Sequence, residues 1–103
     1  MTASLSPHTA PVMVASFYKF VTLAQPRAVG ALLGERARAL GLLGTLLLAE
    51  EGLNASIAGT PAAVREFLDF LRADARFANL RDVRESSHDA APFRRLKIKY
   101  KRE

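Results

Sequence analysis

The sequence predicts one α+β domain in which two helices lie on one face of an antiparallel sheet. Strand-like and helix-like stretches alternate along 103 residues, in the order strand, helix, strand, strand, helix, strand, followed by a terminal strand. Half of the residues are apolar and 24% are charged, which is ordinary globular composition, and the length suits a single domain. This order of elements is the split βαβ, ferredoxin-like sandwich.

The first strand and helix follow from local patterning. Residues 12–20 are β-branched and aromatic, with apolar side chains on both faces, so we expect a central strand whose two sides are at least partly covered. A helix is predicted from Pro26, with Gly41 as the left-handed residue that ends it. Gly30 and Gly34 each weaken this helix by about 1 kcal/mol relative to Ala, so packing must hold it. We expect these small residues to let the helix lie close to a sheet.

A hairpin and a second helix come next. Residues 44–50 and 53–58 are predicted as two strands joined at Gly52, which supplies a positive φ. Thr60 is predicted to cap a helix that has Pro61 in its first turn. Four apolar residues then recur at i, i+3, i+4 and i+7, which indicates an amphipathic helix: Val64, Phe67, Leu68 and Leu71. Residues 81–87 are predicted as a polar edge strand and residues 93–102 as the last extended segment.

All of the excess charge lies at the carboxyl end. The net charge is +5, and residues 93–103 contain six cations and one anion, so residues 1–92 sum to zero. Strand alternation would place four cations on one face of the last strand, with Leu96, Ile98 and Tyr100 on the other: Arg95, Lys97, Lys99 and Lys101. The cations of such a row repel one another unless a polyanion or an acidic partner neutralises them, and nucleic acid does so through its phosphates. The alternative is a solvated tail or a charged edge strand that discourages aggregation.

Several classes of chemistry are excluded or unsupported. The chain has no cysteine, which excludes disulfides, thiolate metal sites and a thiol nucleophile. His8 and His88 have no partner at ligand spacing, and Glu50 and Glu51 fit a solvated turn, so we expect no metal, no cofactor and no catalytic residue. The longest apolar stretch, residues 42–49, is too short to span a bilayer. We expect a disordered leader over residues 1–11, one domain over residues 12–103, and a soluble cytoplasmic protein with no membrane partner.

Three stretches occur together in an order that resembles a known family. They are Phe-Tyr-Lys-Phe at residues 17–20, a hairpin at residues 48–59 that contains Glu-Gly-Leu-Asn-Ala, and Phe-Arg-Arg-Leu-Lys-Ile-Lys at residues 93–99. The chain resembles the N-terminal, acylphosphatase-like domain of the rhodanese-containing tRNA uridine hydroxylases, also described as rhodanese-like sulfurtransferases. Leu53 and Ala58 depart mildly from the usual Ile and Ser.

The resemblance implies an oxidoreductase that converts the tRNA wobble uridine to 5-hydroxyuridine with oxygen. In that family a rhodanese domain with the active cysteine follows this domain, whereas here that domain is absent from the chain. The resemblance therefore implies an accessory domain that is not active alone, with two partners: tRNA, and a rhodanese domain of the same full-length chain or of a separate protein.

Seven cations are the candidate RNA contacts: Lys19, Arg94, Arg95, Lys97, Lys99, Lys101 and Arg102. Tyr18 could stack on a base, but we expect it in the core with its hydroxyl at the rim. One alternative function is a protein-interaction module that docks a rhodanese domain. A less favoured one is acylphosphatase, which shares the fold but uses a Gly-rich, Arg-bearing loop after the first strand; residues 20–25 contain neither Gly nor Arg.

Overall fold

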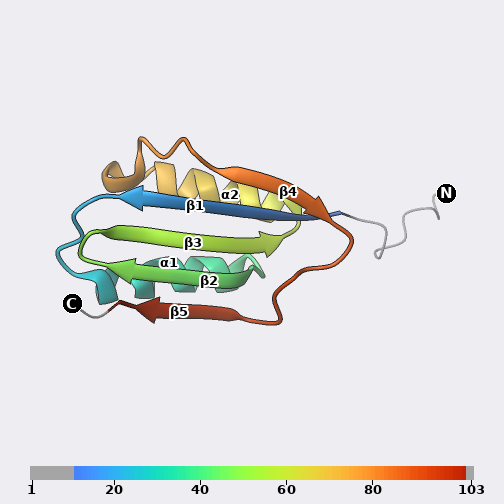
Figure 1. Ribbon diagram of the computed structural model, residues 1–103, viewed down its shortest axis with the longest axis horizontal. Helices are drawn as coiled ribbons and strands as arrows, with labels where there is room; N and C mark the ends of the chain where they lie inside the picture. The colour runs from blue at the N-terminus through green and yellow to red at the C-terminus, as the bar shows by residue number, and fades with distance from the viewer. Residues whose placement is uncertain (1–10, 102–103) are drawn as a thin grey trace.

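The computed structural model describes residues 11–101, in which five strands form one sheet with both helices behind it (Figure 1). The elements are β1 Val12–Phe20, α1 Pro26–Ala39, β2 Leu43–Ala49, β3 Gly52–Gly59, α2 Pro61–Arg72, the short 3₁₀ helix η2 Ala75–Phe77, β4 Arg84–His88 and β5 Leu96–Tyr100. The α+β, ferredoxin-like prediction is confirmed. Residues 1–10 of the predicted leader lie outside the described residues.

The sheet has the strand order β4-β1-β3-β2-β5. The first four strands pair antiparallel, as expected, but β5 pairs parallel to β2, so the sheet is mixed. The reason is visible in Figure 1: after β4 the chain passes around the end of the sheet to the opposite edge and then runs in the direction of β2. The basic carboxyl end thereby becomes one edge of the sheet, far from β4.

Glycines let α1 approach β5, as the sequence predicts. An added Cβ at Gly30 would meet the hydroxyl and ring of Tyr100, with Cε1 at 2.9 Å, and one at Gly34 would meet Cδ1 of Ile98. Gly41 follows the helix with a φ of +72°, which confirms its predicted left-handed role. The helix therefore lies against the sheet edge because two of its residues lack side chains.

The core lies between the sheet and the helices. Thr60 caps α2 by accepting a hydrogen bond from the Ala63 amide at 3.1 Å. The amphipathic face of α2 is fully packed, and its four predicted core residues are all buried: Val64, Phe67, Leu68 and Leu71. They meet the side chains of β1 and β3 that point toward the helices. The prediction of an amphipathic second helix is confirmed.

No helix covers the opposite face of the sheet within residues 11–101, and we call this the open face (Figure 1). Tyr18 and Phe20 lie on it and are 40% and 75% exposed. The expectation that both sides of the first strand are at least partly covered holds at Val14, which lies on this side and is buried, but fails at Tyr18 and Phe20. The placement of Tyr18 in the core is wrong. Side chains alternate between the two faces of a strand, so Phe17 lies under the helices whereas Tyr18 and Phe20 lie on the open face.

The last two strands are shorter than predicted. β4 begins at Arg84 rather than at residue 81, and all five of its residues are exposed, as expected of a polar edge strand. β5 begins at Leu96, so Arg94 and Arg95 precede it in a bend. Within residues 11–101, neither helix has the length and apolar character needed to cross a bilayer.

Candidate nucleic-acid interface

The cations of β5 alternate with side chains that anchor the strand. Lys97 and Lys99 are exposed, whereas Leu96, Ile98 and Tyr100 are half-buried against the core. Lys97 is paired in register with Thr45 and Lys99 with Leu47, so both lysines lie on the open face. The predicted division into a cationic and an apolar side is confirmed for Lys97 and Lys99, whereas Arg95 and Lys101 of the predicted row lie outside the strand.

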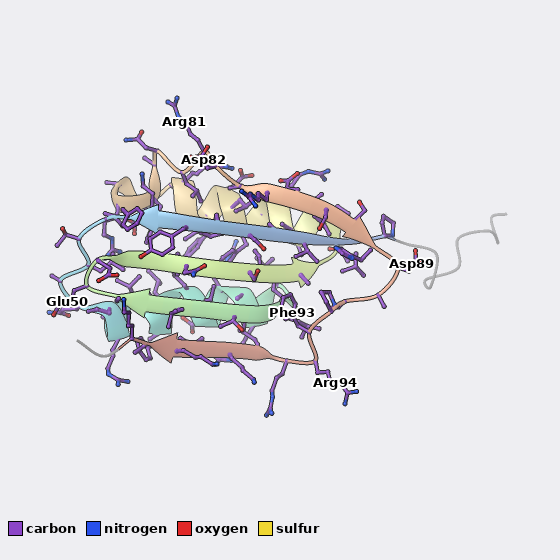
Figure 2. The ribbon with its side chains drawn as sticks, viewed as in Figure 1. Glu50, Arg81, Asp82, Asp89, Phe93 and Arg94 are labelled. Atoms are coloured by element: carbon purple, nitrogen blue, oxygen red, sulfur yellow. The ribbon has the colours of Figure 1, made fainter. Side chains whose placement is uncertain are left out.

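Backbone hydrogen bonds continue the β2–β5 pairing at both ends. The Gly44 amide donates to the Arg95 carbonyl at 3.0 Å, and the Lys101 amide donates to the Leu48 carbonyl at 2.9 Å. Arg94 projects away from the sheet below β5 (Figure 2). The cations next to Lys97 and Lys99 in sequence are therefore held at the same edge.

Lys101 differs from Lys97 and Lys99 because it has an acidic partner. Its Nζ lies 3.2 Å from Oε2 of Glu51 at the β2–β3 turn, in a pair whose two side chains are about half exposed. Exposed pairs of this kind contribute little stability, but the carboxylate compensates part of the charge of Lys101. Within residues 11–101, Lys97 and Lys99 take part in no ion pair.

The structure does not bring Lys19 to this edge. Lys19 pairs in register with Leu53, a core residue under the helices, so alternation places it on the covered side of the sheet. Strands β3 and β2 separate β1 from β5, a distance of about 14 Å for three interstrand spacings. Lys19 is thus a poor candidate for the same surface. That surface is formed by residues on one face of strands that are adjacent in the sheet, and Lys19 lies on the other face. The seventh candidate, Arg102, lies outside the described residues.

Register rows across the open face add residues that sequence reasoning did not select. One row runs across all five strands: Arg84, Ser16, Ser56, Thr45 and Lys97. The next row consists of Tyr18, Asn54, Leu47 and Lys99. The period-two spacing of Tyr18 and Phe20 was a signal for a shared face; the placement of Arg84 needed the β1–β4 pairing, which the sequence does not give.

The charged strand residues described on the open face are all cations. Cations lie at both of its edges, from Arg84 on β4 to Lys97 and Lys99 on β5, and no Asp or Glu lies on it among the described strand residues. Glu85 of β4 is paired with Ala15 and so points to the helix side. A surface with this distribution attracts polyanions and repels acidic partners.

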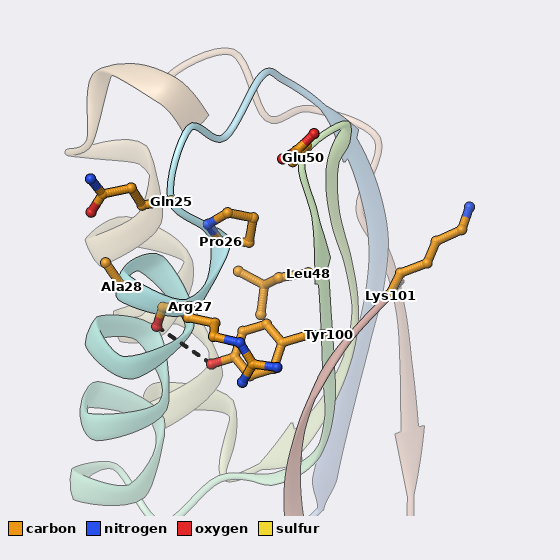
Figure 3. Close-up of a pocket in the computed structure, with 8 residues that line it drawn as sticks. All are labelled: Gln25, Pro26, Arg27, Ala28, Leu48, Glu50, Tyr100 and Lys101. Atoms are coloured by element: carbon orange, nitrogen blue, oxygen red, sulfur yellow. Dashed lines mark hydrogen bonds between the residues drawn. The ribbon is translucent and has the colours of Figure 1, made fainter. Parts of the chain in front are cut away.

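A separate pocket of about 450 Å³ lies where α1 begins (Figure 3). The Arg27 guanidinium stacks on the Tyr100 ring, 4.4 Å from its centroid, and Lys101 points away from the pocket. The β1–α1 connection, residues 21–25, has no glycine and no arginine. The pocket therefore lacks the phosphate loop on which the acylphosphatase alternative depends.

Comparison with known proteins gives a family and a fold. Residues 12–103 match the family described as UPF0176 acylphosphatase like domain. A tRNA uridine(34) hydroxylase of Variovorax paradoxus (strain S110) is 54% identical over 86 residues, which cover 84% of this chain and 32% of that protein. Another, from Rhizobium leguminosarum bv. trifolii (strain WSM2304), is 44% identical over 103 residues, which cover 100% of this chain and 33% of that protein. The chain thus spans about a third of the length of these curated relatives.

Two solved structures share the fold at low sequence identity. BlrB, a BLUF protein in its dark state, has a TM-score of 0.69 at 21% identity, with 89% of this chain and 74% of that chain covered. The acylphosphatase of Bacillus subtilis has a TM-score of 0.58 at 12% identity, with 87% of this chain and 98% of that chain covered. At these identities the likeness describes the fold alone.

Proposed function

Because the chain belongs to the UPF0176 acylphosphatase-like domain family, we propose that it is the tRNA-contacting N-terminal domain of a tRNA wobble-uridine 5-hydroxylase. The main support is the edge strand β5, whose Lys97 and Lys99 are exposed and have no acidic partner within residues 11–101. Relatives named tRNA uridine(34) hydroxylase supply the substrate class. Phosphates of tRNA would neutralise the cations that otherwise repel one another along the strand.

The catalytic step belongs to the part of such a protein that this chain does not span. The chain has no cysteine, and it matches only about a third of its relatives' length. We place the oxygen-dependent hydroxylation in a linked rhodanese domain, and give this chain the role of holding the tRNA. Arg94 and Arg95 can each grip a phosphate with two hydrogen bonds, whereas the lysines act as point charges.

Charge reversal at β5 tests the proposal. We expect the double variant Lys97→Glu, Lys99→Glu to weaken binding of unmodified tRNA by at least about tenfold, because each substitution replaces an attraction to phosphate by a repulsion. Affinity is measured by a gel-shift titration or fluorescence anisotropy at fixed salt.

A matched control distinguishes a loss of affinity caused by this surface from one caused by the lower net charge. Arg38 on α1 and Arg65 on α2 are exposed and belong to the helix layer. The double variant Arg38→Glu, Arg65→Glu changes the net charge by the same amount and should retain most of the affinity. Equal losses in the two variants, or no loss in the β5 variant when both melt like the wild type, would exclude β5 as the contact and leave it as a solvated edge.

A further inference from the structure

We propose that the open face holds unpaired bases of RNA on Tyr18 and Phe20, with the β5 lysines on phosphates farther along the same RNA strand. The inference rests on the proposed function for its ligand, RNA, but concerns a different chemistry: recognition of bases in addition to phosphates. It assigns a role to the face of the sheet, whereas the proposed function concerns the edge.

The two rings form a continuous aromatic surface on β1. Their centroids are 4.3 Å apart, and the rings are tilted at 42° to each other. Tyr18 is 40% exposed and Phe20 is 75% exposed, which leaves ring faces open to solvent. Phe20 has no polar atom that could explain its exposure, so a ligand or partner that covers it gains by burying it.

The surroundings of the rings suit RNA. Across the sheet from Tyr18 in register lie Asn54, Leu47 and Lys99, so an amide and a cation follow the ring along one row. The exposed Asn54 side chain makes no hydrogen bond within the described residues, and an amide can both donate to and accept from a base edge. Stacking, edge recognition and phosphate neutralisation are thus available along one register row, on β1, β3 and β5.

Charge decides between RNA and a protein as the occupant. An apolar patch alone would also suit a protein partner, but the open face has cations at both edges and no acidic strand residue among those described. A single-stranded RNA can stack its bases on the two rings and place its phosphates against the cations. A duplex does not, because its bases are already stacked on one another and cannot reach the rings.

A tryptophan reporter tests the stacking directly. The chain contains no tryptophan, so Phe20→Trp introduces a single fluorophore on the open face. We titrate this variant with a seven-nucleotide oligouridylate and with an abasic ribose-phosphate oligomer of the same phosphate number. The oligouridylate should quench the emission, and the abasic oligomer should bind without quenching it.

Affinities of ring-deleted variants give a second readout. Tyr18→Leu, Phe20→Leu keeps apolar bulk but removes both rings, and should weaken oligouridylate binding at least about fivefold with abasic binding unchanged. Tyr18→Phe retains the ring and should bind like the wild type. Lys97→Glu, Lys99→Glu should weaken both probes, so a failure of phosphate contact is distinguishable from a failure of stacking.

Two results would overturn the inference. Unchanged oligouridylate affinity of the ring-deleted variant shows that the rings hold no bases, and leaves the open face to a protein partner. Equal quenching of Phe20→Trp by both oligomers shows that the fluorophore senses charge or proximity rather than a stacked base. Neither result bears on the β5 phosphate contact, which the Lys97→Glu, Lys99→Glu variant tests separately.

Discussion

Gly30 and Gly34 lie one turn apart on α1, but an added methyl group would meet different neighbours at the two positions. At Gly30 it would strike the rigid ring of Tyr100, with two ring carbons at 2.9 Å, whereas at Gly34 it would meet the mobile end of Ile98. Replacing glycine by alanine in a helix normally stabilises it by about 1 kcal/mol. Packing, not intrinsic propensity, should decide the outcome here.

We therefore expect opposite effects of the two alanine substitutions. Gly30→Ala should destabilise the fold by about 1–3 kcal/mol through overpacking, because the ring must move. Gly34→Ala should be neutral or stabilising, since the Ile98 terminus can rotate away. Chemical denaturation midpoints of the two variants measure the difference, and a stabilised Gly30→Ala protein would contradict the packing of α1 on β5.

Asp74 gives the stability a dependence on acid pH. It caps η2 by accepting a hydrogen bond from the Arg76 amide, and its carboxylate also pairs with the Arg76 guanidinium at 2.7 Å. Hydrogen bonding to the Arg76 side chain lowers the pKa of Asp74 from 3.8 to about 2. Since the folded pKa is below the unfolded one, the pair stabilises the fold above about pH 4 and loses this contribution as the pH falls toward 2.

The corresponding test compares the wild type with Asp74→Asn, which keeps the capping hydrogen bond. The variant should be less stable by about 0.5 kcal/mol near neutral pH, because the pair is partly exposed to solvent. The gap should close between about pH 4 and pH 2 in urea titrations. A gap that is constant with pH would mean that the charge of Asp74 contributes nothing to folding.

At the scale of elements, α2 joins the helix layer to the sheet through one buried face. Phe67 is fully buried in the main core cluster, and its ring lies 6.5 Å from that of Phe70. Removing it leaves a cavity that the surrounding strands fill only in part, so Phe67→Ala should cost about 3–5 kcal/mol. Arg65→Ala, on the exposed side of the same helix, should change the stability by less than about 0.5 kcal/mol. Similar melting temperatures for the two variants would refute the packing of α2.

At the scale of the whole molecule, the ion pairs of the described residues leave the two β5 lysines uncompensated. In the helix layer Arg36 of α1 pairs with Glu66 of α2 at 3.0 Å, whereas Lys97 and Lys99 have no such partner within residues 11–101. The salt dependence of tRNA affinity measures how many phosphates this edge neutralises. Reversal of both lysines should reduce the slope of log affinity against log salt by about 0.7–0.9 for each phosphate that the edge no longer neutralises.

Local signals in the sequence determined most of the elements. Pro26 and Gly41 bound α1, Thr60 caps α2, and Gly52 has a φ of +153° where the β2–β3 hairpin turns. These signals involve only residues a few positions apart, so the sequence displays them directly. The same holds for the alternation of Lys97 and Lys99 with Ile98, because the period of a strand is two.

Only the tertiary structure decided which residues share the candidate interface. Strand pairing put β5 beside β2 and separated Lys19 from Lys99, and it placed Tyr18 on the open face. Alternation assigns side chains to two sides of a strand, but it does not say which side the helices cover or which strands become neighbours. Those choices depend on burial of the whole apolar surface at once, through contacts between residues far apart in the chain, and no local pattern encodes them.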